Sequence, residues 1–416
     1  MSKYDNASLV QIPSGYKAGT LYSVLPANGD GDFDFTRASI ATRVNAEGLI
    51  ESVASGVPRL DYPLLNGVVQ SCPALLLEPA RTNVFANSQN FTGYAITGAT
   101  ISSDSVISPD GTQNASTLTT SVSGGTFNLT GTIANGNVTF SVFVKKDSVN
   151  GVRLRIDADT DSNGYFDLVN NTIHSSDNNA KIENYGNGWY RVSVSANITG
   201  FVKANIYTTN GTTSYDNGTL YIWGAQLEAG SYTTSYIPTS GTTVPRAAEV
   251  CNGAGTSAEF NDSEGVLFAE ISALANDGTN RVLGISDDSA SDRVIIYFSS
   301  TSNQIASFIS SSGISQATLT YSLTDVTSLN KIAVKYKLND IGFWVNGFEV
   351  GTDTLATMPI GLLDLSFDNG TGTEPFYGKT KQLIAFDAAL TDEELEDLTS
   401  WDSFEEMAAS QLYTIY

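Results

Sequence analysis

Aspartate alternates with other residues in one short segment of the chain. Asp157, Asp159 and Asp161 stand two positions apart, and Asn163-Gly164 follows them. Side-chain oxygens at alternate positions are typical of calcium loops, so these three aspartates are candidate ligands of a structural calcium ion. The glycine comes two residues later than in an EF-hand, however, and no glutamate closes the loop. A plain hairpin turn over residues 161–164 is the favoured alternative, and no other cofactor is expected.

Aromatic side chains that could stack on a sugar ring form a second group. Trp344 and Tyr377 are the candidate ligand-binding residues of the C-terminal half, although Trp344 suits a core position equally well because apolar residues flank it. Four further aromatic candidates lie in the first of two expected β-sandwiches: Tyr165, Tyr207, Trp189 and Trp223. The two tryptophans alternate with apolar neighbours, which favours core packing over ligand stacking for both.

The side chains that catalysis needs are scarce. The single histidine, His174, lies in a segment typical of a strand edge and loop. Nucleophilic catalysis needs an imidazole beside the nucleophile, and glycan hydrolysis needs two opposed carboxylates. No expected strand carries an alternating series of acids, and the dense acids at 393–397 fall in an expected helix. We therefore expect no enzymatic activity.

The net charge and the two cysteines limit the binding partners that the protein can have and the compartment in which it is made. The 416 residues include 44 acidic and 21 basic ones, a formal net charge of −23. Such a surface repels phosphate backbones and anionic lipid, so neither nucleic acid nor membrane is an expected partner. The sequence shows no apolar run of ~20 residues and no secretory pattern at its start. We expect synthesis in a cytoplasm, with Cys72 and Cys251 as free, buried thiols.

The elements that must position these residues are strands. The chain has 37 glycines and only 16% charged residues, and its short alternating runs are separated by Asn-Gly pairs such as Asn163-Gly164 and Asn187-Gly188. The expected strands are 138–144, 152–156, 189–194 and 218–227, then 265–271, 293–298, 304–309, 331–338, 341–345, 348–350 and 381–386. This pattern predicts an all-β fold with two β-sandwich domains.

The expected domain division follows composition. Residues 1–85, punctuated by prolines, are expected to form an extended N-terminal attachment or assembly region that packs against either the first sandwich or neighbouring copies of the chain. Residues 86–240 form the first sandwich, 241–252 a linker, 253–400 the second sandwich and 401–416 a tail. One short helix should cap the second sandwich, because Thr391 and Glu394 form a capping box with Leu390 and Leu395 in the staple positions.

Three stretches resemble a modular pattern of tailed-bacteriophage structural proteins. The first contains Thr36-Arg37-Ala38-Ser39, Val57-Pro58-Arg59 and Leu77-Glu78-Pro79-Ala80-Arg81. The second contains Gly188-Trp189-Tyr190-Arg191-Val192, Trp223-Gly224-Ala225-Gln226-Leu227-Glu228 and Thr234-Ser235-Tyr236-Ile237-Pro238, and it resembles the carbohydrate-binding-module-like jelly roll of phage fibre proteins. The third contains Asn346-Gly347, Phe386-Asp387 and Leu390-Thr391-Asp392, and it is similar to the end of concanavalin-like, laminin-G-like lectin domains.

The resemblance implies a structural component of a phage virion. It would be a head or tail fibre or spike, homotrimeric by analogy, with other phage head or tail proteins as partners. It would either contact host cell-surface glycans or only anchor another protein, and it would be made in the bacterial host cytoplasm and located in the virion. The alternatives are a polysaccharide depolymerase and a bacterial surface lectin or adhesin.

Overall fold

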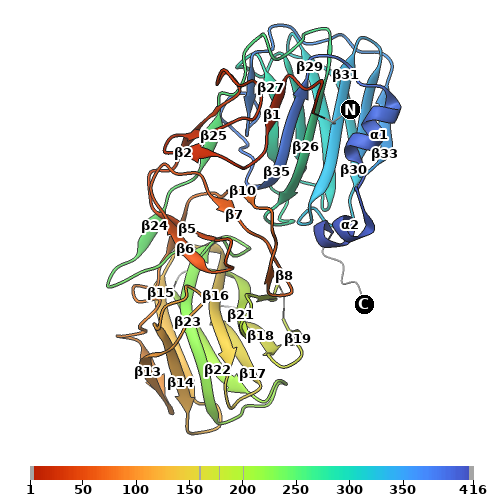
Figure 1. The fold of residues 1–416 in the computed structure, drawn as a ribbon. Helices are drawn as coiled ribbons and strands as arrows, with labels where there is room; N and C mark the ends of the chain where they lie inside the picture. The colour runs from red at the N-terminus through yellow and green to blue at the C-terminus, as the bar shows by residue number, and fades with distance from the viewer. Residues whose placement is uncertain (1–3, 159–160, 178, 200, 412–416) are drawn as a thin grey trace.

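The computed structural model describes residues 4–158, 161–177, 179–199 and 201–411. Figure 1 shows two β-sandwiches, one below the other, joined by paired extended segments. Strands account for most of the regular structure, and the two helices of the described residues lie near the C-terminal end. The expected all-β class with β-sandwich domains is confirmed.

The first sandwich consists of two antiparallel six-stranded sheets. In order across the first, which we call the β17 sheet, the strands are β12 (Ala95–Thr97), β15 (Thr126–Thr132), β22 (Phe201–Thr209), β17 (Gly151–Asp157), β18 (Ser162–Asp167) and β19 (Thr172–Ser176). In order across the second, the β16 sheet, they are β13 (Ala99–Val106), β14 (Ala115–Thr120), β23 (Gly218–Ala229), β16 (Gly136–Lys146), β21 (Trp189–Ile198) and β20 (Lys181–Asn184).

Alternate side chains of both sheets fill the space between them. Phe127 and Leu154 from the β17 sheet meet Phe140 and Val192 from the β16 sheet in one buried cluster. Because successive strand residues point to opposite faces, the residues between these apolar positions lie on the outer faces. The tryptophans Trp189 and Trp223 are buried in a smaller cluster beside this core, which confirms their expected packing role.

The second sandwich has an eight-stranded sheet facing a five-stranded one. Across the larger, the β26 sheet, the strands are β33 (Phe348–Asp353), β32 (Ile341–Val345), β31 (Asn330–Lys337), β26 (Glu264–Ala273), β35 (Gly378–Phe386), β10 (Ala74–Leu77) and β7 (Leu60–Asp61), with β1 (Leu9–Gln11) also on β35. Across the smaller they are β30 (Ile314–Ser322), β29 (Gln304–Ser311), β28 (Arg293–Phe298), β27 (Arg281–Ser286) and β34 (Asp364–Ser366).

The N-terminal residues are built into this second sandwich. In the strand register, Leu9 pairs with Ala385 and Leu75 with Thr380. A four-stranded sheet joins β2 (Tyr16–Lys17), β3 (Thr20–Leu21) and β4 (Phe33–Thr36) to β25 (Val250–Asn252). The described residues of the region 1–85 therefore supply strands to the second sandwich, which was not expected. They also contact the first sandwich, as expected, through Ile50 and Thr42.

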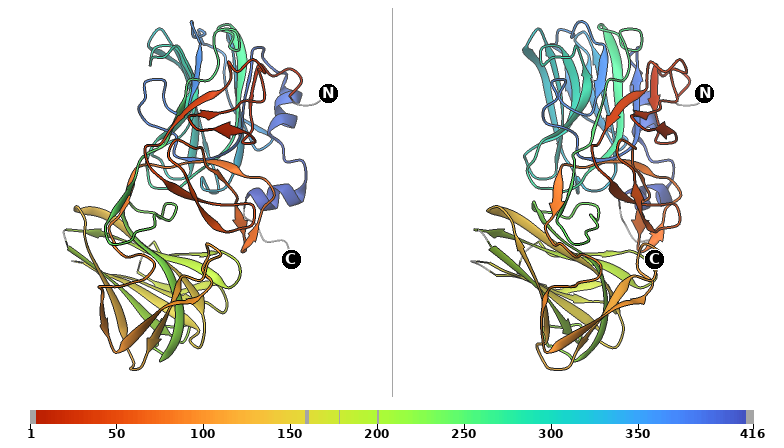
Figure 2. Two further views of the ribbon diagram at one scale, coloured as in Figure 1. Left: turned by 60° about the vertical axis from the view of Figure 1, so that its left-hand side comes forward. Right: turned by 90° about the vertical axis from the view of Figure 1, so that its left-hand side faces the viewer.

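The expected linker also differs from the structure. Within residues 241–252, β24 (Val244–Arg246) pairs with β11 (Arg81–Asn83), and β25 pairs with β4. Since β11 leads into the first sandwich and β24 leads out of it, the first sandwich is inserted within the second. Figure 2 shows these two connections running side by side. Two small hairpins also lie where the sandwiches meet (Figure 1): β5 (Ala41–Val44) with β6 (Ile50–Val53), and β8 (Leu64–Leu65) with β9 (Val68–Val69).

Helix α1 (Asp392–Thr399) covers the outer face of the β26 sheet. Its capping box is formed as expected, with Thr391 accepting from the Glu394 backbone and Glu394 accepting from that of Thr391. Leu395 and Leu398 are buried against this sheet. A second helix, α2 (Phe404–Ser410), lies where only a tail was expected. Within the described residues, neither helix has the length and apolar character needed to cross a membrane.

The cysteines are both free, as expected, but only one is buried. Cys251 lies in the core of the second sandwich, whereas Cys72 is exposed. The expectation of two buried thiols was wrong for Cys72, because it lies in the turn between β9 and β10 rather than in a strand.

Candidate ligand-binding face of the first sandwich

The outer face of the β17 sheet presents polar and aromatic side chains in cross-strand rows. Arg153 of β17 pairs in register with Tyr207 of β22 on one side and with Tyr165 of β18 on the other. Because directly opposite residues point to the same face, these three side chains lie next to one another. Tyr165 and Tyr207 were candidates for sugar stacking, and the structure brings them together around a cation.

Three tyrosine rings surround the Arg153 guanidinium. Its Cζ lies 4.9 Å from the ring centroid of Tyr207, 5.2 Å from that of Tyr165 and 5.8 Å from that of Tyr215, which follows β22 in a loop. Such distances allow cation–π attraction, which holds the planar guanidinium in place. We call these four residues the tyrosine–arginine row.

Hydrogen bonds of Arg153 go to a carboxamide and a phenol. Its Nε and Nη2 donate to Asn163 Oδ1 over 3.1 and 2.6 Å, and its Nη1 donates to the Tyr215 hydroxyl. Asn163 Nδ2 donates in turn to Asp177 Oδ2 at 2.5 Å. Arg153 is only 8% exposed, whereas Tyr215 is 37% exposed. The row therefore combines reachable ring faces with a fixed, largely desolvated donor group.

A second row of amides lies beside the first. Asn128, Asn205 and Arg155 are in register across β15, β22 and β17. Both amide atoms of Asn205 and the Oδ1 of Asn128 are buried without a hydrogen-bond partner among the residues that the structure describes. Buried polar atoms of this kind cost about 1–3 kcal/mol each. They are hydrogen-bonding capacity that the protein itself leaves unused next to the tyrosine–arginine row.

Arg153 was not singled out from the sequence, although a signal was present. Residues 152–156 alternate apolar and basic side chains, which places Arg153 and Arg155 opposite the core. Which tyrosines lie beside them depends on the register of three strands, and alternation alone does not give register.

Two of the three aspartates predicted to bind calcium, Asp157 and Asp161, lie at the end of this face. Asp157 and Asp161 both form ion pairs with Arg155, and Asp159 lies outside the described residues. The expected turn over 161–164 is misplaced, since residues 162–164 belong to β18 and the hairpin bend precedes them. Arg155 already balances the charge of two of the three aspartates, and calcium binding here stays a prediction.

The structure separates the two remaining candidate residues. Trp344 is 6% exposed and packs with Leu395 and Leu398 under α1, so it serves the core. Tyr377 is half-buried against the core of the second sandwich, and burial raises its pKa. His174 lies exposed on the edge strand β19.

The densest cluster of charged residues lies where the two sandwiches join. Glu249 accepts from Arg37 Nη1 at 2.7 Å and from Arg59 Nε at 2.8 Å, while Glu78 forms ion pairs with Arg59 and Arg246 at 2.8 and 2.7 Å. Burial alone would lower the pKa of Arg59, but the carboxylates of Glu249 and Glu78 more than offset this and raise it. Burial would likewise raise the pKa of Glu78, but Arg246 and Arg59 hold it well below its ordinary value.

These charged groups pair with one another across the junction. Ser235 of the first sandwich donates from its backbone and its hydroxyl to Glu78, at 2.7 and 2.6 Å. Arg37, Arg59 and Glu78 belong to the stretches that carry the phage-protein resemblance, so those motif residues have a structural role here. Arg246 and Glu249 were missed by the sequence analysis, because they belong to the supposed linker.

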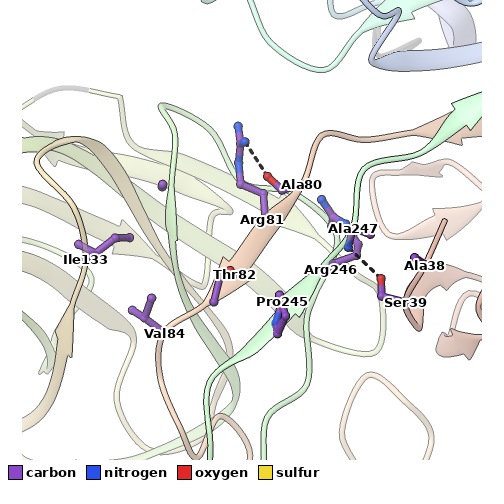
Figure 3. A pocket seen from close by; sticks show the side chains of 11 residues that line it. Ala38, Ser39, Ala80, Arg81, Thr82, Val84, Ile133, Pro245, Arg246 and Ala247 are labelled. Carbon is purple, nitrogen blue, oxygen red and sulfur yellow. Dashed lines mark hydrogen bonds between the residues drawn. The ribbon is translucent and has the colours of Figure 1, made fainter. Parts of the chain in front are cut away.

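Two depressions elsewhere on the molecule are alternative candidates for a binding site. A groove of about 450 Å³ lies beside β11 and β24, with Val84 and Ile133 on one side and Ser39 and Ala247 on the other (Figure 3). Most of its lining is small or apolar. Its most buried charged residue, Arg246, is used in the junction. The groove therefore offers few directed polar contacts to a ligand.

The other depression, of about 350 Å³, is acidic. Asp288, Asp364 and Asp368 line it. Burial, reinforced by the charges of the other two aspartates, raises the pKa of Asp364 to about 6. Asp368 accepts from Asn252 Nδ2 and from the backbone of Gly370, and Ser366 donates to Asp364. Among the described residues, no acidic, histidine or cysteine group has an arrangement that could hold a metal ion.

Comparisons with known proteins add distant likenesses only. No family model matches the chain, and no curated protein matches it. Among solved structures, the CBM40 of the Ruminococcus gnavus IT-sialidase bound to alpha2,3 sialyllactose is 15% identical and has a TM-score of 0.30, covering 34% of this chain and 84% of that one. A putative carbohydrate binding protein from Bacteroides ovatus is 11% identical with a TM-score of 0.26, covering 67% and 80% of the two chains.

Domains LG4-5 of the mouse laminin alpha1 chain give a similar result. They are 11% identical with a TM-score of 0.24, covering 76% of this chain and 92% of that one. At these TM-scores the likenesses carry no argument about the present chain. Its fold class rests on its own sheets, and its function must be argued from its own side chains.

Proposed function

We propose that this chain is a non-catalytic glycan-binding protein that holds a sugar on the outer face of the β17 sheet. The observation that supports this most strongly is the tyrosine–arginine row. Sugar rings present apolar C–H faces bordered by hydroxyls, and a ring-binding site therefore needs aromatic faces beside fixed polar groups. Tyr165, Tyr207 and Tyr215 supply the faces, and Arg153 with Asn163 supplies the polar groups.

The wider setting that we propose is a bacteriophage virion, in which the chain is a fibre or spike component and self-associates as a trimer. Support comes from the resemblance in the sequence, whose motif residues form the buried ion pairs between the sandwiches. A junction of that kind suits a rigid displayed protein. Mass spectrometry of purified particles should find the chain as a stoichiometric component, and its absence would end the virion part of the proposal.

A glycan array followed by calorimetric titration tests the binding itself. Wild-type protein should bind at least one glycan, and the double variant Tyr165→Ala, Tyr207→Ala should bind it at least tenfold more weakly, since each stacked ring contributes about 1 kcal/mol. Tyr321→Ala is the matched control, because Tyr321 is 39% exposed on β30 of the other sandwich. Equal affinity of the double variant and the control would place the site elsewhere.

The non-catalytic part of the proposal has its own test. Incubation with capsular or exopolysaccharide followed by reducing-end detection should show no release of sugar. Release that depends on any carboxylate of this chain would favour the depolymerase alternative instead.

A further inference from the structure

The charge of Arg153 is unbalanced within the tyrosine–arginine row. The residue is 8% exposed, and its guanidinium donates to the Asn163 carboxamide and the Tyr215 phenol. The nearest carboxylate in this hydrogen-bond chain is Asp177, which contacts Asn163 rather than the arginine. Taking a cation out of water is costly unless an anion accompanies it. Within the part of the chain that the structure describes, no carboxylate pairs with Arg153.

The nearest arginine on the same face is paired with carboxylates. Arg155, two residues along the same strand and on the same face, forms ion pairs with both Asp157 and Asp161. Arg191, also buried in this sandwich, likewise forms no ion pair with any residue that the structure describes. It donates instead to the buried Thr234 carbonyl and Ser141, on the β16 sheet side. Arg153 is therefore the cation that stands uncompensated on the candidate binding face.

Resting on the proposed function, we infer that the sugar bound here is acidic, and that its carboxylate is the counter-ion of Arg153. A guanidinium binds a carboxylate through two parallel N–H···O bonds, which a neutral hydroxyl cannot match. The ligand carboxylate would replace the Tyr215 hydroxyl as the acceptor of Nη1 and would accept the second hydrogen of Nη2, while Asn163 keeps Nε and the first Nη2 hydrogen. Tyr215 lies in a loop and is partly exposed, so its side chain can turn away from Arg153 without a change in the strands of the sheet. Uronic and sialic acids share the required chemistry.

Paired ligands that differ only in the carboxylate test the inference. Uronate oligosaccharides and sialyl oligosaccharides are each titrated beside their carboxyl-reduced counterparts, and the two arms distinguish the two kinds of acid. Wild-type protein should bind the acidic member of at least one pair ten times more tightly or better. Arg153→Gln should lower this preference to less than about threefold, and Arg153→Lys should keep an intermediate preference, because a lysine keeps the charge and loses the two-point geometry.

Lys337→Gln is the control for net charge. Lys337 lies on the second sandwich, is paired with Glu264 and is half-exposed, so this variant should keep the full preference. Thermal unfolding of each variant confirms that it is folded before it is titrated. Equal binding of acidic and reduced sugars by the wild type would overturn the inference and leave the proposed function standing. Binding of no glycan at all, on the array or in the titrations, would overturn both.

Discussion

Arg59 and Glu249, 190 residues apart in the sequence, form a two-point ion pair in which neither side chain is exposed. Glu249 also accepts from Arg37 and from the backbone N–H of Glu78 at 2.9 Å. One carboxylate thus joins three segments of the N-terminal region to the segment between β24 and β25, which returns from the first sandwich. The junction between the sandwiches is held by directed hydrogen bonds rather than by apolar contact alone.

Replacing this carboxylate should weaken the fold strongly. In Glu249→Gln, the buried guanidinium groups of Arg37 and Arg59 would lose their main negative partner, which costs about 3–5 kcal/mol for a broken buried pair. The free energy of unfolding, measured in denaturant, should fall by that order. Glu51→Gln is the control, because Glu51 pairs with Arg43 at a partly exposed position and should cost less than about 1 kcal/mol. Similar losses in both variants would contradict the structural role given to Glu249.

Features that depend on neighbours in sequence could be predicted, and those that depend on distant pairing could not. The Thr391 capping box and the Asn346-Gly347 hairpin are encoded within a few residues, and both are present. The pairing of Leu9 with Ala385 joins opposite ends of the chain, so no local pattern reveals that residues 1–85 complete the second sandwich. Local signals can also mislead, since Asn163-Gly164 lies inside β18 although it has the composition of a turn.

The candidate site shows the same division. Tyr165 and Tyr207 were recognisable as aromatic residues of alternating strands, but the arginine between them is set by the register of β17 with its two neighbours. The role of Glu249 was hidden for a different reason. It follows Pro238 and Pro245 in a segment whose composition suggests a linker. Its partners, Arg37 and Arg59, are far away in the sequence and come close only in the folded protein.

The two thiols should differ sharply in reactivity. Cys72 is exposed in a turn, whereas burial raises the pKa of Cys251 well above its ordinary value, so its reactive thiolate form is suppressed. A chromogenic thiol reagent should therefore modify one equivalent in native protein and two in denaturant. Cys72→Ser should abolish the native signal and leave one equivalent after unfolding. Fast modification of both thiols in native protein would show that the core around Cys251 opens readily.

Asp364 should make the second sandwich less stable as pH rises through the weakly acidic range. Its pKa of about 6 in the folded state exceeds the ordinary 3.8 because of burial and of the nearby charges of Asp288 and Asp368. The folded state therefore holds a proton between about pH 4 and 6 that the unfolded state releases, and stability falls over that interval and levels off above it. Removing the charge of Asp364 should therefore raise the free energy of unfolding only at a pH at which its carboxylate is ionised.

The test compares Asp364→Asn with wild type in a buffer containing a metal chelator. The free energy of unfolding of the variant should be higher by about 1–2 kcal/mol at pH 7.5 and unchanged at pH 4. The expected gain is smaller than the pKa shift alone would give, because the carboxyl group is partly screened by solvent. Asp397→Asn, on the exposed side of α1, should have little effect at either pH. A loss of stability at pH 7.5 would mean that the ionised carboxylate makes a favourable contact.

Excision of the first sandwich should leave two folded proteins. Arg81 and Arg246 are paired in register, so both connections pass the same point, and a short glycine–serine linker can join residue 80 to residue 247. Residues 81–246 should fold alone, because they contain both sheets of the first sandwich and its core. Each piece should show one cooperative thermal transition.

The fragment 253–416 is the decisive comparison. It corresponds to the division expected from the sequence, and it lacks β1, β4, β7 and β10, whose residues Leu9, Phe35, Leu60 and Leu75 belong to the core of the second sandwich. It also leaves the inner edge of β35 unpaired, and such an edge favours aggregation. Circular dichroism and sedimentation should show this fragment to be unfolded or aggregated. Residues 1–80 joined to 247–416 should instead be monodisperse or form a defined oligomer. A stable, cooperatively folded 253–416 would show that the N-terminal strands are an accessory to the second sandwich and that its core is complete without them.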